Sequence, residues 1–144
     1  MKQADGFTLL ETMAVLGIMT ILMSMALLNL SKFNLNSSNA ANEIASLIKN
    51  ARAYGMTSTV TVLVKPVSTS KITVTTASTC GATTRTTVPE LSLTLPNGAT
   101  LSSTAWSLCY TSRGLSKESV NIAVSDRSLL KTVQVTLGGG IRVI

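Results

Sequence analysis

The chain has 144 residues, carries a formal net charge of +6 and contains no histidine. This length predicts one domain, and the lack of histidine excludes Ser-His-Asp and Cys-His catalytic sites and every histidine-ligated metal site. From residue 31 onward there are only four acidic residues, widely separated, so neither a catalytic carboxylate pair nor a calcium loop is predicted.

An apolar segment dominates the N-terminal part of the chain and ends near Leu30. Residues 12–31 are 20 positions without a formal charge, and as a helix rising ~1.5 Å per residue they would cover the ~30 Å core of a bilayer. We therefore predict a membrane-spanning helix over residues 7–30. Glu11 lies inside the apolar run, where a carboxylate costs up to about 3 kcal/mol, so it requires a partner.

Cleavage between Gly6 and Phe7 would create such a partner, because the new α-amino group would lie four positions before Glu11, one helical turn away or on a neighbouring copy. A short leader containing Lys2, followed by Gly6, Phe7, Thr8-Leu9-Leu10 and Glu11, resembles the N-terminus of type IV pilins and type II secretion pseudopilins. This resemblance implies that prepilin peptidase removes residues 1–6 and that the Phe7 amine is methylated. It also implies that Glu11 pairs with a free N-terminus when helix 7–30 becomes a filament core.

Two ordinary membrane segments are alternatives to this interpretation. Ser24-Met25-Ala26 could be the cleavage site of a secretory signal, and the segment could be a plain anchor, but neither gives Glu11 a role. The pilin interpretation predicts a single-pass inner-membrane protein whose head, residues 31–144, lies in the periplasm before entering a pilus or pilus-like filament. Its implied partners are prepilin peptidase, other pilins or pseudopilins, the inner-membrane assembly machinery and, before assembly, membrane lipid; no cofactor is implied.

The head begins with a predicted amphipathic helix. Ile44, Leu47, Ile48, Ala51 and Tyr54 recur at helical spacing and form one apolar stripe. The Asn- and Ser-rich stretch 34–42 is a poor helix former and is expected to interrupt the helix before this stripe. The glycine at position 55 is expected to cap its C-terminal end.

The remainder of the head has the alternating pattern of short strands. Together with the preceding helix it predicts an α+β fold: a long N-terminal α-helix, membrane-spanning in its first half and amphipathic in its second, packed on short antiparallel strands. The turns between the strands contain Gly, Pro, Asn, Asp or Ser and are expected at 65–70, 96–98, 112–114, 126–128 and 138–140. The expected strands are 60–64, 72–74, 91–95, 106–110, 120–124, 133–137 and 141–144.

Two short patterns in the head resemble the GspH/FimT group of minor pilins and pseudopilins. They are the strand and Arg-Gly turn at 108–114, and the strand, Gly-rich turn and basic tail at 133–143. In the periplasm that the resemblance implies, disulfides form and persist, so we predict that Cys80 pairs with Cys109. The closed loop of roughly 30 residues would contribute ~3 kcal/mol in the chain-entropy model; two separately buried thiols are the alternative.

No enzyme is expected. The catalytic-like spacing Ser46-x-x-Lys49 resembles that of penicillin-recognising acyl enzymes, but the companion Ser-Asp-Asn and Lys-Thr-Gly motifs are missing. Both residues also lie off the apolar stripe, on a helix face that we expect to be solvated.

DNA binding is an alternative function for the basic head, which carries 11 bases and four acids. The tail Gly138-Gly139-Gly140-Ile141-Arg142 resembles the Gly-Arg-x-Arg ending of DNA-uptake minor pilins, with Gly140 replacing the first arginine; a tight hairpin is the competing interpretation. The bases are scattered through the sequence, which favours simple solubility. A third alternative is a secretion pseudopilin that contacts exported protein. The candidate DNA contacts are Arg142, Arg113, Lys117, Arg127 and Lys131.

Overall fold

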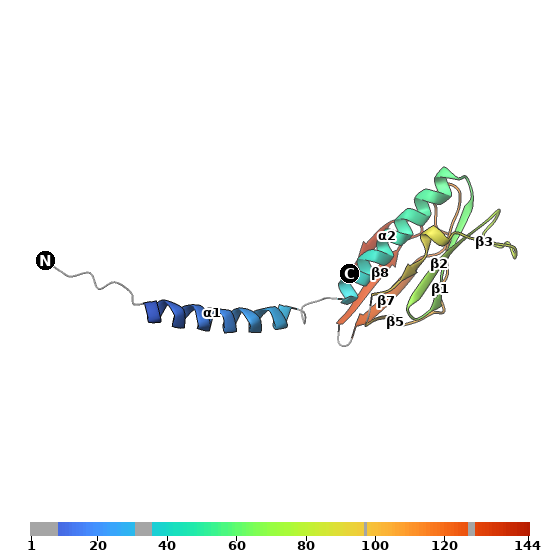
Figure 1. Ribbon diagram of the computed structural model, residues 1–144. Coiled ribbons are helices and arrows are strands. Elements are labelled where there is room, and N and C mark those ends of the chain that lie inside the picture. The colour runs from blue at the N-terminus through green and yellow to red at the C-terminus, as the bar shows by residue number, and fades with distance from the viewer. Residues whose placement is uncertain (1–8, 31–35, 97, 127–128) are drawn as a thin grey trace. The chain divides into compact units, whose positions relative to one another are not determined.

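The computed structural model describes residues 9–30, 36–96, 98–126 and 129–144 (Figure 1). The chain divides into two compact units, Met1–Asn34 and Leu35–Ile144. The second of these units is the head.

Helix α1 (Leu9–Leu30) is the described element of the first unit. Its hydroxyls are satisfied within the helix: Thr12, Thr20 and Ser24 each donate to the carbonyl three residues earlier, at 2.9, 2.8 and 2.7 Å. The side chains of residues 9–24 are exposed in the isolated chain. Among the described residues, no helix has the combination of length and hydropathy that a membrane span requires, and the span over 7–30 stays a prediction.

Helix α2 (Asn36–Thr57) provides the core face of the head. The predicted stripe is buried, with Ile44, Ile48 and Ala51 at 0% exposure. The expected interruption at 34–42 is wrong for the described part, because the helix already runs from Asn36. Ala40 and Ala41 continue the stripe and are also fully buried, so tertiary packing overrides the weak helix propensity of the Asn and Ser residues around them.

The end of α2 also differs from the prediction. Gly55 lies inside the helix, where an added Cβ would come within 3.0 Å of the Val62 side chain, so this glycine permits close packing of helix on strand and is not the cap. The cap is Thr59, which has φ 56°. The Val60 N–H donates to the Gly55 carbonyl at 3.1 Å, which is the Schellman arrangement with threonine in the left-handed position that glycine usually occupies.

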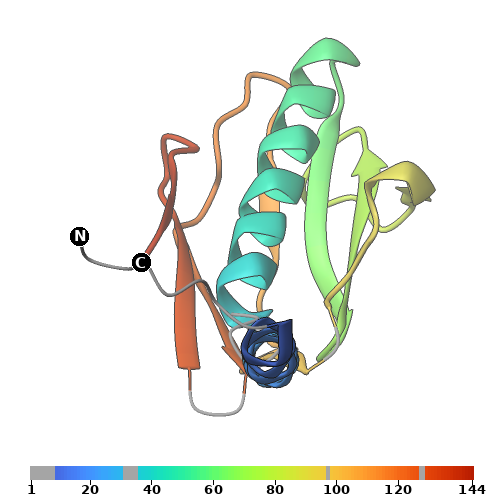
Figure 2. The ribbon, with the colours of Figure 1, turned by 60° about the vertical axis from the view of Figure 1, so that its left-hand side comes forward.

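Two antiparallel sheets complete the α+β fold, which is confirmed. The first has the order β3 (Thr86–Thr87), β2 (Lys71–Ala77), β1 (Thr61–Ser68), β6 (Leu108–Tyr110), with β4 (Leu93–Thr94) also paired to β2. The second has the order β5 (Ala99–Leu101), β7 (Val120–Asp126), β8 (Leu129–Val135), β9 (Ile141–Val143). Figure 2 shows α2 lying along the sheets, and it packs on strands of both.

The strand predictions fail mainly where the pairing is short. Residues 91–95 form the end of a 3-10 helix, η2 (Pro89–Leu91), followed by the two-residue strand β4, not a full strand. Strand β1 continues to Ser68, which shortens the expected turn at 65–70 to the pair 69–70. Pro66 is tolerated there because β6 pairs only with residues 62–64 of β1, and the remainder of that side is an open edge.

Replacing Thr59 by glycine should stabilise the head, because a β-branched residue with positive φ is strained and glycine is not. The expected gain is about 1 kcal/mol in the free energy of unfolding, measured by urea denaturation.

The matched control for this change is Ser58→Gly, which adds glycine at the neighbouring position without a positive φ to relieve. It should leave stability unchanged or slightly lower it. Equal effects of the two substitutions would contradict the assignment of strain to Thr59.

Candidate functional site

The predicted processing and assembly site lies at the N-terminus. Gly6 and Phe7, the residues on either side of the expected cleavage, lie outside the described residues. Glu11 occupies the first turn of α1, where the partial positive charge of a helix N-terminus favours a carboxylate. It is exposed in the isolated chain, as are its neighbours Leu10 and Met13 at 79% and 66%.

In the head, two glycine turns are arranged around one arginine. In the first, the Gly114 N–H donates to the Thr111 carbonyl at 2.8 Å, and in the second the Gly139 N–H donates to the Thr136 carbonyl at 2.8 Å. Gly114 and Gly139 have φ of 75° and 77°, so both turns require the left-handed conformation that glycine adopts without strain.

Arg52 of α2 lies between these two turns. Its guanidinium Nη1 donates to the Gly139 carbonyl at 2.9 Å. A Cβ on Gly139 would lie 2.7 Å from the Gly114 carbonyl oxygen and 2.9 Å from Arg52 Cζ, and a Cβ on Gly114 would lie 2.6 Å from Met56 Sδ. The arginine and the two glycines therefore fix the C-terminal turn on the helix. No local pattern in the sequence predicts this role of Arg52, because the two turns that it contacts lie far from it along the chain.

Tyr110 of β6 is fully buried, and its hydroxyl lies within the electrostatic influence of Arg52. Neither its hydroxyl nor Arg52 Nε has a hydrogen-bond partner among the described residues. Burial raises the pKa of Tyr110 to about 12, although the nearby Arg52 charge opposes that shift. A phenol with this pKa stays neutral at ordinary pH.

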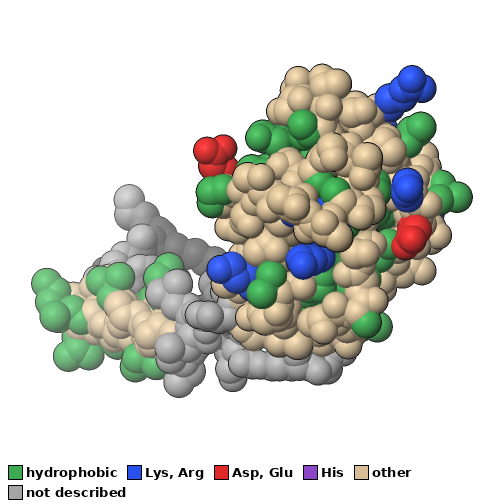
Figure 3. Space-filling view, turned by 90° about the vertical axis from the view of Figure 1, so that its right-hand side faces the viewer, with side chains coloured by type: hydrophobic (Ala, Val, Ile, Leu, Met, Phe, Trp, Pro, Cys, Tyr) green, Lys and Arg blue, Asp and Glu red, His purple; other side chains and the backbone are tan. Residues whose placement is uncertain are grey.

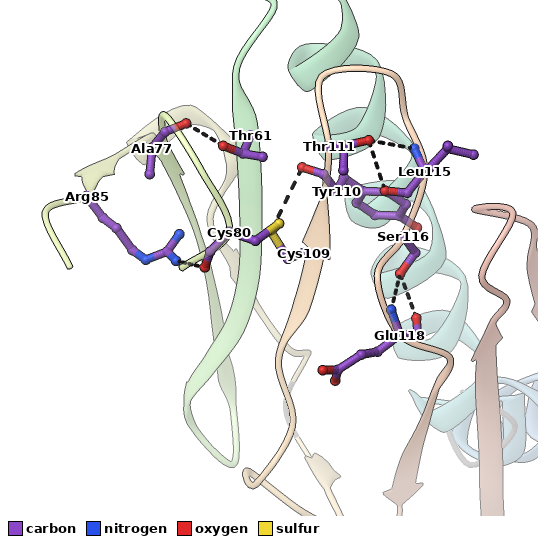
Figure 4. Close-up of a disulfide and its surroundings, with 10 residues drawn as sticks. All are labelled: Thr61, Ala77, Cys80, Arg85, Cys109, Tyr110, Thr111, Leu115, Ser116 and Glu118. Atoms are coloured by element: carbon purple, nitrogen blue, oxygen red, sulfur yellow. Dashed lines mark hydrogen bonds between the residues drawn. A yellow bond between two sulfur atoms is a disulfide. The ribbon is translucent and has the colours of Figure 1, made fainter. Parts of the chain in front are cut away.

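The disulfide joins Cys80 to Cys109, with a Cα–Cα distance of 6.0 Å. It connects the segment after β2 to strand β6, which lies on the far side of β1 (Figure 4). An Arg85 Nη donates to the Cys80 carbonyl. This crosslink therefore connects the β2 end of the first sheet to its edge strand β6, across β1.

Two of the candidate DNA contacts, Lys131 and Arg142, do not share a surface. Lys131 alternates with its neighbours in β8 so that it lies on the same face as the buried Val133 and Val135. Arg142 is the cross-strand partner of Gln134, which lies on the other face of β8. The two bases therefore point to opposite faces of the second sheet. Lys117 lies beside Cys109, to which its N–H donates at 3.2 Å, and Arg127 lies outside the described residues. The face in Figure 3 likewise shows Lys and Arg side chains at separate places, with acidic side chains on the same face.

The described residues also contain no group of three His, Cys, Asp or Glu side chains suited to a metal ion. Ser46 and Lys49 are both exposed on α2, on the helix face predicted to be solvated.

Comparison with known proteins finds a sequence motif at the N-terminus and solved structures with a similar fold. Residues 1–27 match the prokaryotic N-terminal methylation motif. The structure is similar to the type IV minor pilin FimU of Pseudomonas aeruginosa (TM-score 0.56, 11% identity, covering 75% of this chain and 87% of FimU). It is also similar to the minor pseudopilin EpsH of the Vibrio cholerae type 2 secretion system (TM-score 0.55, 12% identity, covering 76% of this chain and 96% of EpsH). None of the curated proteins matches this chain.

The chain joins the methylation motif to a fold that it shares with a minor pilin and a minor pseudopilin. The methylation motif supports the resemblance at the N-terminus, and the fold shared with FimU and EpsH supports the resemblance of the head to the GspH/FimT group of minor pilins and pseudopilins. At 11% and 12% identity the structural likeness establishes the fold alone.

Replacing Gly139 by alanine should destabilise the pilin-like head by about 2 kcal/mol or more, because a Cβ would meet backbone at 2.7 Å in a left-handed conformation. Thermal or urea unfolding of the variant would measure this loss.

Gly138→Ala is the matched control, since a Cβ at Gly138 has no atom within 4 Å. The adjacent substitution should cost less than about 0.5 kcal/mol, as an ordinary surface change does. Equal losses at both positions would contradict the packing of Gly139 on Arg52.

Tyr110→Phe should be neutral or slightly stabilising at pH 7, because it removes a buried hydroxyl that has no partner among the described residues. The folded state holds the Tyr110 proton more tightly than the unfolded chain, so wild-type stability should be complete below pH 10 and fall as the pH rises toward 12.

The phenylalanine variant should lose that alkaline component of the pH dependence, which unfolding in urea at a series of pH values would reveal. Identical pH profiles for the two proteins would show that Tyr110 does not cause the loss.

Proposed function

We propose that this chain is a non-catalytic minor pilin or minor pseudopilin. It is cleaved after Gly6, methylated on Phe7, and assembled into a type IV pilus or pilus-like filament through α1. The observation that carries the proposal is the methylation motif at residues 1–27, joined in one chain to a head with the pilin-like fold.

The surface of α1 supports assembly. Leu9, Leu10 and Leu16 are 77%, 79% and 64% exposed in the isolated chain, and a continuous apolar surface of this kind is normally covered by lipid or by other helices. Lipid would cover it before assembly and neighbouring pilin helices afterwards. Glu11, in the same surface, would pair with the methylated α-amino group of Phe7 in its own chain or in a neighbouring subunit.

The proposed localisation is the inner membrane, with the head in the periplasm, followed by the filament. The Cys80–Cys109 disulfide supports a head outside the cytoplasm, where such bonds persist. The proposed partners are prepilin peptidase, the inner-membrane assembly machinery and other pilins or pseudopilins. DNA capture has weaker support, because Lys131 and Arg142 point to opposite faces of their sheet.

Intact-mass analysis and N-terminal sequencing of the membrane-extracted protein should identify Phe7 as the first residue, carrying one added methyl group. A chain that begins at Met1, or after Ala26 as a secretory signal would give, would exclude the proposal.

Glu11→Gln should leave membrane insertion intact and reduce incorporation into filaments by about tenfold or more, because the isosteric amide keeps the shape of the side chain and removes its charge. Quantitative immunoblotting of sheared filaments and of the membrane fraction would measure both quantities.

Thr12→Val is the matched control in the same helical turn, since it removes a hydroxyl that bonds only its own helix. It should assemble normally. Wild-type incorporation of the Glu11→Gln protein would contradict the charge-pair mechanism while leaving cleavage and methylation as separate tests.

A further inference from the structure

The Cys80–Cys109 disulfide forms part of the wall of a surface pocket of about 240 Å³. The wall is completed by Leu63, Gly81 and Ser107 and by two residues of opposite charge, Lys117 and Glu118. Both cysteines are only half-buried. The crosslink therefore lies beside a cavity with room for a small thiol, in contrast to a disulfide enclosed in a core.

The two sulfur atoms differ in their surroundings. Cys109 belongs to β6 and is paired with Leu63 of β1. Cys80 lies in the irregular segment between β2 and β3, and a Cβ on the adjacent Gly81 would have no atom within 4 Å. The backbone around Cys80 is therefore less enclosed than that around Cys109, and this difference favours attack at Cys80 Sγ with Cys109 as the leaving group.

Charge on the wall favours the same direction of attack. The Lys117 main-chain N–H donates to the Cys109 carbonyl at 3.2 Å, and Lys117 lines the same pocket as both cysteines. A nearby ammonium lowers the pKa of a departing thiolate and attracts the incoming one, and both effects accelerate exchange. Glu118 carries the opposite charge and would oppose them. Its main chain is held by Ser116, whose hydroxyl donates to the Glu118 carbonyl at 2.6 Å, so its side chain can be changed without losing that bond.

We propose that this pocket is a thiol–disulfide exchange site that accepts a thiolate at Cys80 Sγ while the head remains folded. A bond forms between the incoming sulfur and Cys80 Sγ, the Cys80–Cys109 bond breaks, and its electron pair leaves with Cys109 as a thiolate. With a dithiol, the second thiolate then attacks the mixed disulfide. Two electrons pass from the dithiol to the protein, the dithiol becomes a cyclic disulfide, and Cys80 is released as a thiolate. This chemistry is independent of filament assembly.

The head has other contacts that would keep it folded during exchange. Strand β1 pairs with β2 along residues 61–68 and with β6 at residues 62–64, and α2 packs on both sheets. Exchange would therefore release the segment that carries Cys80 without requiring the strands to separate.

The test uses the full-length protein in detergent, treated with 2-mercaptoethanol or dithiothreitol, quenched in acid and alkylated. The expected reduction rate rises in proportion to thiolate concentration, and the trapped mixed disulfide maps to Cys80 with the alkyl group on Cys109. A rate that becomes independent of thiol concentration would overturn the proposal, because exchange would then wait for unfolding. A mixed disulfide on Cys109 would also overturn it.

Two charge variants test the role of the pocket wall. Lys117→Gln should slow the reaction about two- to fivefold at low salt, and Glu118→Gln should accelerate it by a similar factor, with both differences shrinking in ~1 M salt. Equal rates for both variants and wild type would contradict the assignment of the approach to this pocket. Circular dichroism of the intact variants would verify that each is folded.

Discussion

The head depends on the close packing of one helix against two sheets. Ala40, Ala41 and Ala51 are fully buried in α2, and their small side chains let the sheets approach the helix axis. At Gly55 the approach is closest, since even a methyl group there would contact Val62 at 3.0 Å. Larger residues at these positions would separate α2 from the strands. Strands β1 and β8, on which α2 packs, would then lose the cover of their buried faces.

The parts of the fold that sequence predicts well are those with sustained periodicity. The 3.6-residue repeat identifies the buried face of α2, and alternation identifies β7 and the inner end of β8 because each presents several buried residues on one side. Strands β3 and β4 have two residues each, too few to show a period of two. Both strands form by pairing with β2. This partner lies outside the short sequence window in which alternation could be recognised, so the residues of β3 and β4 alone do not predict a strand.

The functional features divide in the same way. The N-terminal motif is recognisable because its residues are contiguous, and a cysteine pair is a natural prediction when a chain has only two. Arg52 and Gly139 are 87 residues apart, and only the folded chain brings them together. The glycines at 114 and 139 were visible as turns in the sequence, but nothing local indicates that both turns close on the same guanidinium. Likewise, Lys131 and Arg142 could be grouped as bases from the sequence, whereas the strand register separates them.

In the proposed filament the two units of the chain would have different roles. An apolar helix with one carboxylate can pack on many similar helices, because apolar contacts discriminate weakly, and the proposed charge pair would use an N-terminus that every processed subunit has. The head is more constrained, with the disulfide fixing one sheet and Arg52 fixing the C-terminal turn of the other. FimU and EpsH share this fold with the chain at nearly equal TM-scores of 0.56 and 0.55, although one is a pilus protein and the other a secretion protein. Since α1 is generic and the fold is found in a protein of each system, discrimination between the two kinds of filament in the proposed function would rest on the exposed surface of the head.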